Sequence, residues 1–235
     1  MHQHHSADRA CRLDPVSRTA AHYRDLGSPP SLVIAGLHLT EAEALLLTAR
    51  GLLVPHVNSV YGSTPPCPES RATAAALHLR PLSRQRAILH RLTAAWIYGC
   101  APPPALLECT AFGPSGLTLD PVESAFVRHR YTTYTTYEAL RIGPLRVTTP
   151  LRTCVDLAAF DQDKHGDTAL ATLLRAPGLG CAPETVCAAL EAVPRLAFRK
   201  RAVRRVHALS EGLPWGHWDL RLTPGPGPTG SVGTR

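Results

Sequence analysis

Leu145–Phe160 reads LRVTTPLRTCVDLAAF, and this stretch decides the fold because it predicts a short strand that leads directly into a helix. Thr149 is a preferred N-cap residue, and Pro150 suits the first helical position, where no backbone N–H donor is needed. Apolar residues from Leu151 to Leu157 then favour a helix that packs on a core. A strand followed at once by a capped helix indicates a sheet backed by helices.

The same helix carries a charged pair. Arg152 and Asp156 are one helical turn apart, and this spacing predicts a local ion pair worth a few tenths of a kcal/mol. Asp161 and Asp163 follow, and we expect them to form the exposed exit of the helix into a loop. These carboxylates do not predict a metal site.

The flanking sequence predicts an α+β protein with a small sheet backed by helices. Strands are expected at Leu106–Phe112, Ala125–Tyr131, Tyr137–Ile142 and Leu145–Thr148. Helices are expected at Arg71–Leu79, Ser83–Tyr98, Thr168–Leu174, Pro183–Ala192 and Pro194–Ala208. The turn between the last two strands is Gly143-Pro144. Trp96 is expected to anchor the core, with a ligand-stacking role as the alternative.

The chain divides into four predicted parts. Residues 1–30 are expected to form a flexible tail with one short helix around Pro15 to Asp25, and residues 211–235 a disordered Pro- and Gly-rich tail. Residues 31–79 have the outline of a small winged-helix-like module, in which Thr40 and Glu43 form a capping box before a two-strand wing. Residues 80–210 are expected to form a mixed α/β domain.

Three segments carry a family resemblance. They are Val147–Ala158 (VTTPLRTCVDLA), Thr93–Gly99 (TAAWIYG) and the wing Gly51–Gly62 (GLLVPHVNSVYG). Together they resemble the AbiEi-type antitoxins of bacterial type IV toxin–antitoxin systems, over roughly Leu39 to Leu174. The motif positions are Trp96, Gly99, Thr149, Pro150, Arg152 and Asp156.

The resemblance implies a cytoplasmic DNA-binding transcriptional regulator. Such a protein represses its own operon and opposes a nucleotidyltransferase-like toxin without direct contact. Many proteins similar to this region continue into a domain that resembles very-short-patch-repair endonucleases. After Arg205 this chain carries only Glu211 and Asp219 as carboxylates, which predicts the non-catalytic part alone.

Positive charge is concentrated in one segment. Between Pro194 and Ala208 lie six basic residues and no acidic residue, against a net charge of +7 for all 235 residues. A basic helix suits the phosphate backbone of DNA, because its cations replace condensed counterions. The alternative, held equally open, is an amphipathic helix whose cations only face water.

The predicted partner is double-stranded DNA. Candidate contact residues are Arg50, His56, Asn58, Arg84, Arg199, Lys200, Arg201, Arg204 and Arg205. The helix after Thr40 is a poor recognition helix, because it begins with Glu41 and Glu43 and offers a cation only at its end. Sequence-specific binding is therefore not predicted by these residues.

The stretch Arg128–Tyr137 (RHRYTTYTTY) interleaves basic and aromatic residues. This mixture suits single-stranded nucleic acid, which is held by base stacking and phosphate attraction. It also suits a half-buried edge strand rich in Thr and Tyr, and we favour the strand.

No sequence motif indicates catalysis. Phosphate-binding loops, nucleophile elbows, zinc-protease motifs and dinucleotide fingerprints are all missing, so we predict a non-enzymatic protein without metal, cofactor or small-molecule ligand. Seven cysteines without a C-x-x-C pair or secretory signal indicate a reducing cytoplasm. No apolar run approaches the ~20 residues of a membrane span. Two alternatives remain open, a remnant of a nuclease-fused protein and an interaction domain whose basic helix binds an acidic partner.

Overall fold

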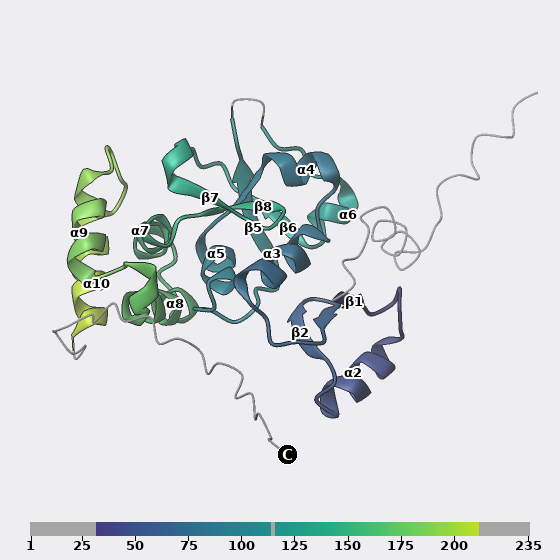
Figure 1. Cartoon of the computed structure of the whole chain (residues 1–235). Helices are drawn as coiled ribbons and strands as arrows, with labels where there is room; N and C mark the ends of the chain where they lie inside the picture. The colour runs from purple at the N-terminus through teal and green to yellow at the C-terminus, as the bar shows by residue number, and fades with distance from the viewer. Residues whose placement is uncertain (1–31, 114–115, 212–235) are drawn as a thin grey trace, which may run out of the picture.

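The structure, a computed structural model, describes residues 32–113 and 116–211 (Figure 1). Within these ranges the chain is α+β, with nine α-helices and two small sheets, which confirms the predicted fold class. The predicted tail of residues 1–30, its short helix, and nearly all of the predicted C-terminal tail lie outside the described residues.

The N-terminal sheet is antiparallel. It contains β1 (Leu32–Ile34), β2 (Val54–Val57) and β3 (Val60–Gly62) in the order β1-β3-β2. Helix α2 (Glu41–Ala49) connects β1 to β2. Its predicted capping box is confirmed, because the Glu43 backbone N–H donates to Thr40 Oγ1 at 3.2 Å and Glu43 Oε2 accepts from the Thr40 backbone N–H at 2.8 Å. The two expected wing strands thus join a third strand.

Helix α2 packs weakly on the rest of the molecule. Ala44 is its only buried residue, while Leu45 is 64% and Leu46 51% exposed. In Figure 1 the helix projects from the lower right of the molecule, below the N-terminal sheet. Assignment of residues 31–79 as a winged helix stays a prediction.

The larger sheet has five strands in the order β6-β5-β4-β8-β7. The strands are β4 (Ala87–Leu89), β5 (Leu107–Ala111), β6 (Val127–His129), β7 (Ala139–Ile142) and β8 (Leu145–Thr148). Strand β4 pairs with β8 in parallel and with β5 antiparallel; β5 and β6 are parallel, and β7 and β8 form a hairpin. Because β6 and β7 are the two edges, the chain between them must cross the whole end of the sheet.

Eight further α-helices are present in the described residues. They are α3 (Pro68–Ala76), α4 (Pro81–Arg86), α5 (Arg91–Ile97), α6 (Pro121–Ser124), α7 (Pro150–Phe160), α8 (Lys164–Arg175), α9 (Pro183–Ala192) and α10 (Arg199–Ser210). Short 3₁₀ segments cover Thr136–Glu138 and Pro177–Leu179. Helices α7 to α10 gather on one side of the molecule, away from α2, and α9 and α10 pack on α7 and α8 rather than on the larger sheet (Figure 1).

Two groups of buried apolar side chains form the core. The first contains Trp96, as expected, and joins N-terminal strands, the alanines of α3 and the larger sheet. It includes Leu32 and Val147, which lie on either side of the predicted boundary at residue 79. The second group fills the space between α5, α7, α8, α9 and α10.

The predicted helix Ser83–Tyr98 is wrong. The chain forms α4, then the strand β4, then α5. Ala87, Ile88 and Leu89 are completely buried, because β4 is the central strand and is covered on both faces. A short apolar run of this kind lacks the two-residue alternation that distinguishes a strand from a buried helix.

The junction at the end of β8 is confirmed. Thr149 caps α7 by accepting a hydrogen bond from the Arg152 backbone N–H at 3.3 Å, and Pro150 is the first helical residue. The edge strands are shorter than expected, because β6 ends at His129 and β7 begins at Ala139. The favoured edge strand over Arg128–Tyr137 is therefore wrong beyond His129, and the intervening chain is irregular apart from one 3₁₀ turn.

Candidate functional site

Some of the cations on helix α10 are exposed to solvent, and others form hydrogen bonds within the protein. Lys200, Arg201 and Arg204 are exposed, as is Arg195 just before the helix. Arg199 is half-buried, and its Nη2 donates to the Val193 carbonyl at 2.6 Å. The buried face of the helix is apolar and packs among the neighbouring helices. The amphipathic helix is therefore confirmed, and DNA binding by its exposed cations stays a prediction.

Arg205 holds α10 to the end of α7. Its Nε donates to Asp167 Oδ1 at 2.5 Å, and one Nη donates to the Leu157 carbonyl at 2.7 Å. The other Nη donates to the Asp161 carbonyl, just past the last turn of α7. Carbonyls at a helix C-terminus lack intrahelical donors, and a cation there also complements the helix dipole. We therefore leave Arg205 out of the proposed DNA surface.

We predict that Arg205→Ala lowers the free energy of unfolding by about 3 kcal/mol, because several hydrogen bonds from a charged group are lost together. Arg204→Ala is the matched control, since it removes the same group from the adjacent exposed position and should change stability by less than about 0.5 kcal/mol. Urea unfolding of both variants measures the difference. Equal losses would contradict a structural role for Arg205.

The N-terminal candidate residues also differ in exposure. Arg50 and Asn58 are exposed at the end of α2 and in the turn between β2 and β3. His56 is 2% exposed and bonded through its ring nitrogens to the Val54 carbonyl and Ser70 Oγ, and burial lowers its pKa. Arg84 is half-buried, with Nε donating to the Leu79 carbonyl. Only the two exposed residues can meet a ligand without rearrangement.

The exposed cations of α10 and the two exposed N-terminal residues, Arg50 and Asn58, lie on elements at opposite ends of the molecule. Figure 1 places α10 at the left edge and α2 at the lower right, with the larger sheet between them. The exposed residues of α10 therefore form a separate site, which we call the α10 surface: Arg195, Lys200, Arg201 and Arg204.

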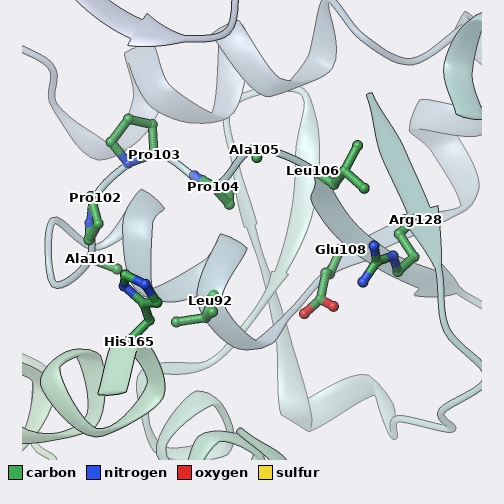
Figure 2. A pocket seen from close by; sticks show the side chains of 10 residues that line it. All are labelled: Leu92, Ala101, Pro102, Pro103, Pro104, Ala105, Leu106, Glu108, Arg128 and His165. Carbon is green, nitrogen blue, oxygen red and sulfur yellow. The ribbon is translucent and has the colours of Figure 1, made fainter. Parts of the chain in front are cut away.

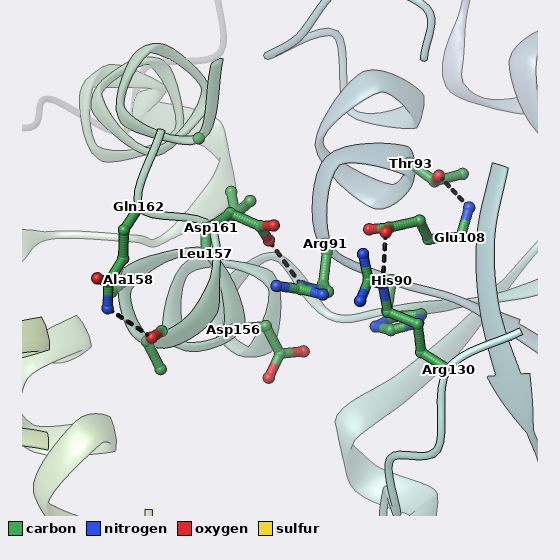
Figure 3. A network of polar contacts seen from close by, with 12 residues as sticks. His90, Arg91, Thr93, Glu108, Arg130, Asp156, Leu157, Ala158, Asp161 and Gln162 are labelled. Carbon is green, nitrogen blue, oxygen red and sulfur yellow. Dashed lines mark hydrogen bonds and ion pairs between the residues drawn. The ribbon is translucent and has the colours of Figure 1, made fainter. Parts of the chain in front are cut away.

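A network of buried polar groups lies at the end of the larger sheet where β4 and β8 terminate, and Figure 3 shows part of it, including His90, Arg91 and Asp156. Asp156 is its centre, 1% exposed. Its two carboxylate oxygens accept from Arg152 Nε at 2.9 Å and from the Tyr134 hydroxyl at 2.7 Å. The predicted Arg152–Asp156 pair is thus confirmed, and Arg152 also donates to Glu138.

Burial shifts the pKa values of this network. It raises the pKa of Asp156, although Arg152 and Tyr134 oppose the shift. Burial also raises the pKa of Tyr134, with the Asp156 charge adding to the effect, so the hydroxyl keeps its proton and serves as a donor. The arrangement fixes three segments to one another: the end of β8 with α7, the 3₁₀ turn, and the chain around Tyr134.

His90 and Arg91 follow the central strand and begin α5. His90 is completely buried, and burial together with the adjacent Arg91 charge lowers its pKa to about 3, so the ring is neutral. Its Nδ1 lies 3.0 Å from the Tyr134 hydroxyl, whereas Nε2 has no hydrogen-bond partner among the described residues. Arg91 has φ +56°, a strained backbone for a non-glycine residue.

Asp161 is paired rather than exposed, which corrects the expectation that it forms an open loop. Arg91 Nε donates to its Oδ2 at 2.7 Å, and both side chains are about nine-tenths buried. Burial raises the pKa of Asp161 to about 6, against the opposing charge of Arg91. Asp163 is exposed as predicted and caps α8 by accepting from the Gly166 backbone N–H at 2.8 Å.

We predict that Asp161 makes stability fall with pH. Its pKa is raised in the folded state from an ordinary 3.8 to about 6, so the stabilising contribution is complete below about pH 3.8 and is lost as the pH rises through about 6. Relative to Asp161→Asn, the wild type should lose about 2 kcal/mol of unfolding free energy between about pH 4.5 and 7.5. Urea unfolding over this range tests it, with Asp163→Asn as the exposed control. A pH-independent difference for Asp161→Asn would contradict the prediction.

A pocket opens beside the network (Figure 2). Its apolar wall is Leu92 with the segment Ala101–Leu106, which includes Pro102, Pro103 and Pro104. Glu108, Arg128 and His165 are its polar lining. Glu108 is 8% exposed and accepts from Arg130 Nε at 2.5 Å, and its Oε2 has no hydrogen-bond partner in the described part of the chain.

Neither site has a metal-binding arrangement. Across residues 32–113 and 116–211, no group of three or more His, Cys, Asp or Glu side chains could hold a metal ion. In the same ranges, no helix is both long and apolar enough to cross a membrane. No family model, curated protein or solved structure matches the chain. The chemistry of the described residues is therefore the only basis for a functional argument.

Sequence patterns found part of the polar network and missed the rest. The four-residue spacing predicts the Arg152–Asp156 pair, and capping rules predict Thr149. Tyr134, His90 and Glu108 come from distant segments, and only the fold brings them to this end of the sheet. A strand that ends directly before His90 and Arg91 places both residues at an end of the sheet. The helix expected over Ser83–Tyr98 does not predict that position.

Proposed function

We propose that this chain is a non-enzymatic DNA-binding regulator of the kind that the AbiEi-type antitoxins represent, and that it binds duplex DNA through the α10 surface. The supporting observation is that Lys200, Arg201 and Arg204 remain exposed on one helix whose other cations stabilise the fold. Cations that need not leave an internal partner can neutralise phosphates at little cost to the protein.

The composition of this surface favours phosphate contacts over base readout. Three cations on a helix neutralise phosphates without discriminating bases, which requires side chains placed in a groove. Acidic groups limit the surface, because Glu191 lines one shallow hollow together with Lys200 and Arg204, and Asp167 lines another together with Arg201. We therefore propose a binding constant dominated by salt, with any preference for the operator supplied elsewhere, for example by Arg50 and Asn58 on the N-terminal module.

The test compares binding of the protein to its own upstream DNA and to a scrambled duplex across a salt series. Lys200→Gln/Arg201→Gln/Arg204→Gln should weaken binding to both duplexes and reduce the slope of log K against log salt by about 2 to 3. The variant keeps Arg205, which holds α10 to the end of α7, so we expect it to fold as the wild type does. Arg141→Gln/Lys164→Gln/Arg175→Gln is the matched control, because it removes three exposed cations that lie on other elements.

The outcomes separate the possible roles. A preference of the wild type for the upstream duplex supports a regulator, whereas equal binding to both supports the remnant of a nuclease-fused protein with general DNA affinity. Loss of binding in the control variant alone would move the DNA surface away from α10. No binding to either duplex would reject the proposal.

The antitoxin role requires a separate test. We expect that co-expression of the full chain with a nucleotidyltransferase-like protein encoded beside it restores growth, and that the two proteins do not co-purify. Growth rescue that persists in the α10 variant would show that protection does not depend on DNA binding. Failure of rescue, or the absence of any such neighbouring gene, would count against the antitoxin role.

A second candidate function is a protein-interaction domain. The observation that favours it is the exposure of Leu45, Leu46 and Leu52, 51 to 64%, on and just after α2. Exposed apolar side chains that lie together characterise interaction surfaces. Leu45→Ser/Leu46→Ser should leave DNA binding by α10 unchanged, which distinguishes the two candidates.

A further inference from the structure

The segment Arg130–Glu138 crosses the end of the larger sheet. It leaves β6 at one edge and enters β7 at the other. Four interstrand spacings of about 4.8 Å separate these edges, so the segment spans about 19 Å. We call it the strap. Its sequence interleaves basic and aromatic residues that take no part in the proposed duplex contact.

The strap is held from below at several points. The Tyr134 hydroxyl donates to Asp156, and Thr110 Oγ1 donates to the Thr132 carbonyl at 2.8 Å. At its far end Glu138 accepts from the Thr135 backbone N–H at 2.7 Å and from Arg152. A segment fixed by buried side chains loses little conformational entropy when a ligand binds, which increases affinity.

Two tyrosines project from the ends of this fixed strap. Tyr131 and Tyr137 are each 93% exposed, while Tyr134 between them is buried. The Tyr131 ring contacts the His129 ring at 4.7 Å between centroids and is otherwise open to solvent. Tyr131 follows β6 and Tyr137 precedes β7, so a ligand that contacts both must be extended.

The charge beside the tyrosines is positive. Arg128 is exposed on β6, where it lines the pocket with Glu108, and the Arg130 side chain, one residue before Tyr131, is 40% exposed even though it pairs with Glu108. Arg141 is exposed on β7, beyond Tyr137. The neighbouring carboxylates are paired, Glu108 with Arg130 and Glu138 with Arg152. Exposed rings flanked by cations complement stacked bases joined by phosphates, and this combination binds single strands with little dependence on sequence.

We propose that the strap binds single-stranded nucleic acid, with bases stacked on Tyr131 and Tyr137 and phosphates beside Arg128 and Arg141. This surface is distinct from the α10 surface and does not depend on it. Duplex DNA does not satisfy it, because paired bases are stacked on each other and present no free faces to the rings.

The test is fluorescence anisotropy of the full chain with a labelled dT20 strand, an abasic strand of the same length and a 20-base-pair duplex. Tyr131→Ala and Tyr137→Ala should each weaken dT20 binding about tenfold, and the double variant more, while duplex binding is unchanged. Tyr131→Phe/Tyr137→Phe keeps both rings and should bind dT20 as the wild type does. An rU20 strand distinguishes RNA from DNA as the source of the same chemistry.

Several outcomes would overturn the proposal. They are equal binding of dT20 and the abasic strand, equal affinities of the Ala and Phe double variants, or no binding of dT20 to the wild type at all. The last outcome would assign the exposed tyrosines to a protein partner instead. Thermal unfolding shows whether the Ala variants are folded, and side chains this exposed should leave the Tm unchanged. Because the α10 variant keeps both rings, its loss of duplex binding with retained dT20 binding would support two separate surfaces.

Discussion

The buried carboxylate of Asp156 is the constraint on which the end of the larger sheet depends. It binds Arg152 within α7 and Tyr134 in the strap, so one charge connects the strand–helix junction with the connection between the sheet edges. A charge this deeply buried is tolerated only when its hydrogen bonds are satisfied, and removal of one partner of such a pair typically costs about 3 to 5 kcal/mol. The geometry of the strap is therefore determined by the contacts that its own Tyr134 and Thr132 make with the interior.

The same reasoning explains why the basic residues of α10 differ from one another. Helix α10 packs against α7, α8 and α9 and lies beside the C-terminal end of α7. The backbone carbonyls at that end have no donors within α7 and need hydrogen bonds from elsewhere. Arg205 provides them, whereas Arg204 at the next position points to solvent. Charge density along the sequence therefore overstates the number of cations available to DNA, because some of them are structural.

The sequence predicted those elements that local rules determine. The Thr149 cap, the Pro150 start of α7, the Thr40–Glu43 capping box and the Arg152–Asp156 pair all depend on residues within one turn, and all are confirmed. The strand β4 was missed because Ala87–Leu89 is apolar on both faces and carries no periodic signal. The pairing of Asp161 with Arg91 was missed because 70 residues separate them, and only the packing of α7 beside α5 brings them together.

The strap illustrates how one sequence pattern can serve packing and binding together. A tyrosine at every third residue suits both an edge strand and a single-strand binding surface. In the structure the middle tyrosine packs while the outer two are exposed, since the segment is irregular up to Thr135 and then forms one 3₁₀ turn, so its side chains need not alternate as they do in a strand. A buried anchor fixes the backbone, and a fixed backbone holds the exposed rings in position. The inward contact of Tyr134 is thus the physical reason that Tyr131 and Tyr137 can meet a ligand with little loss of entropy.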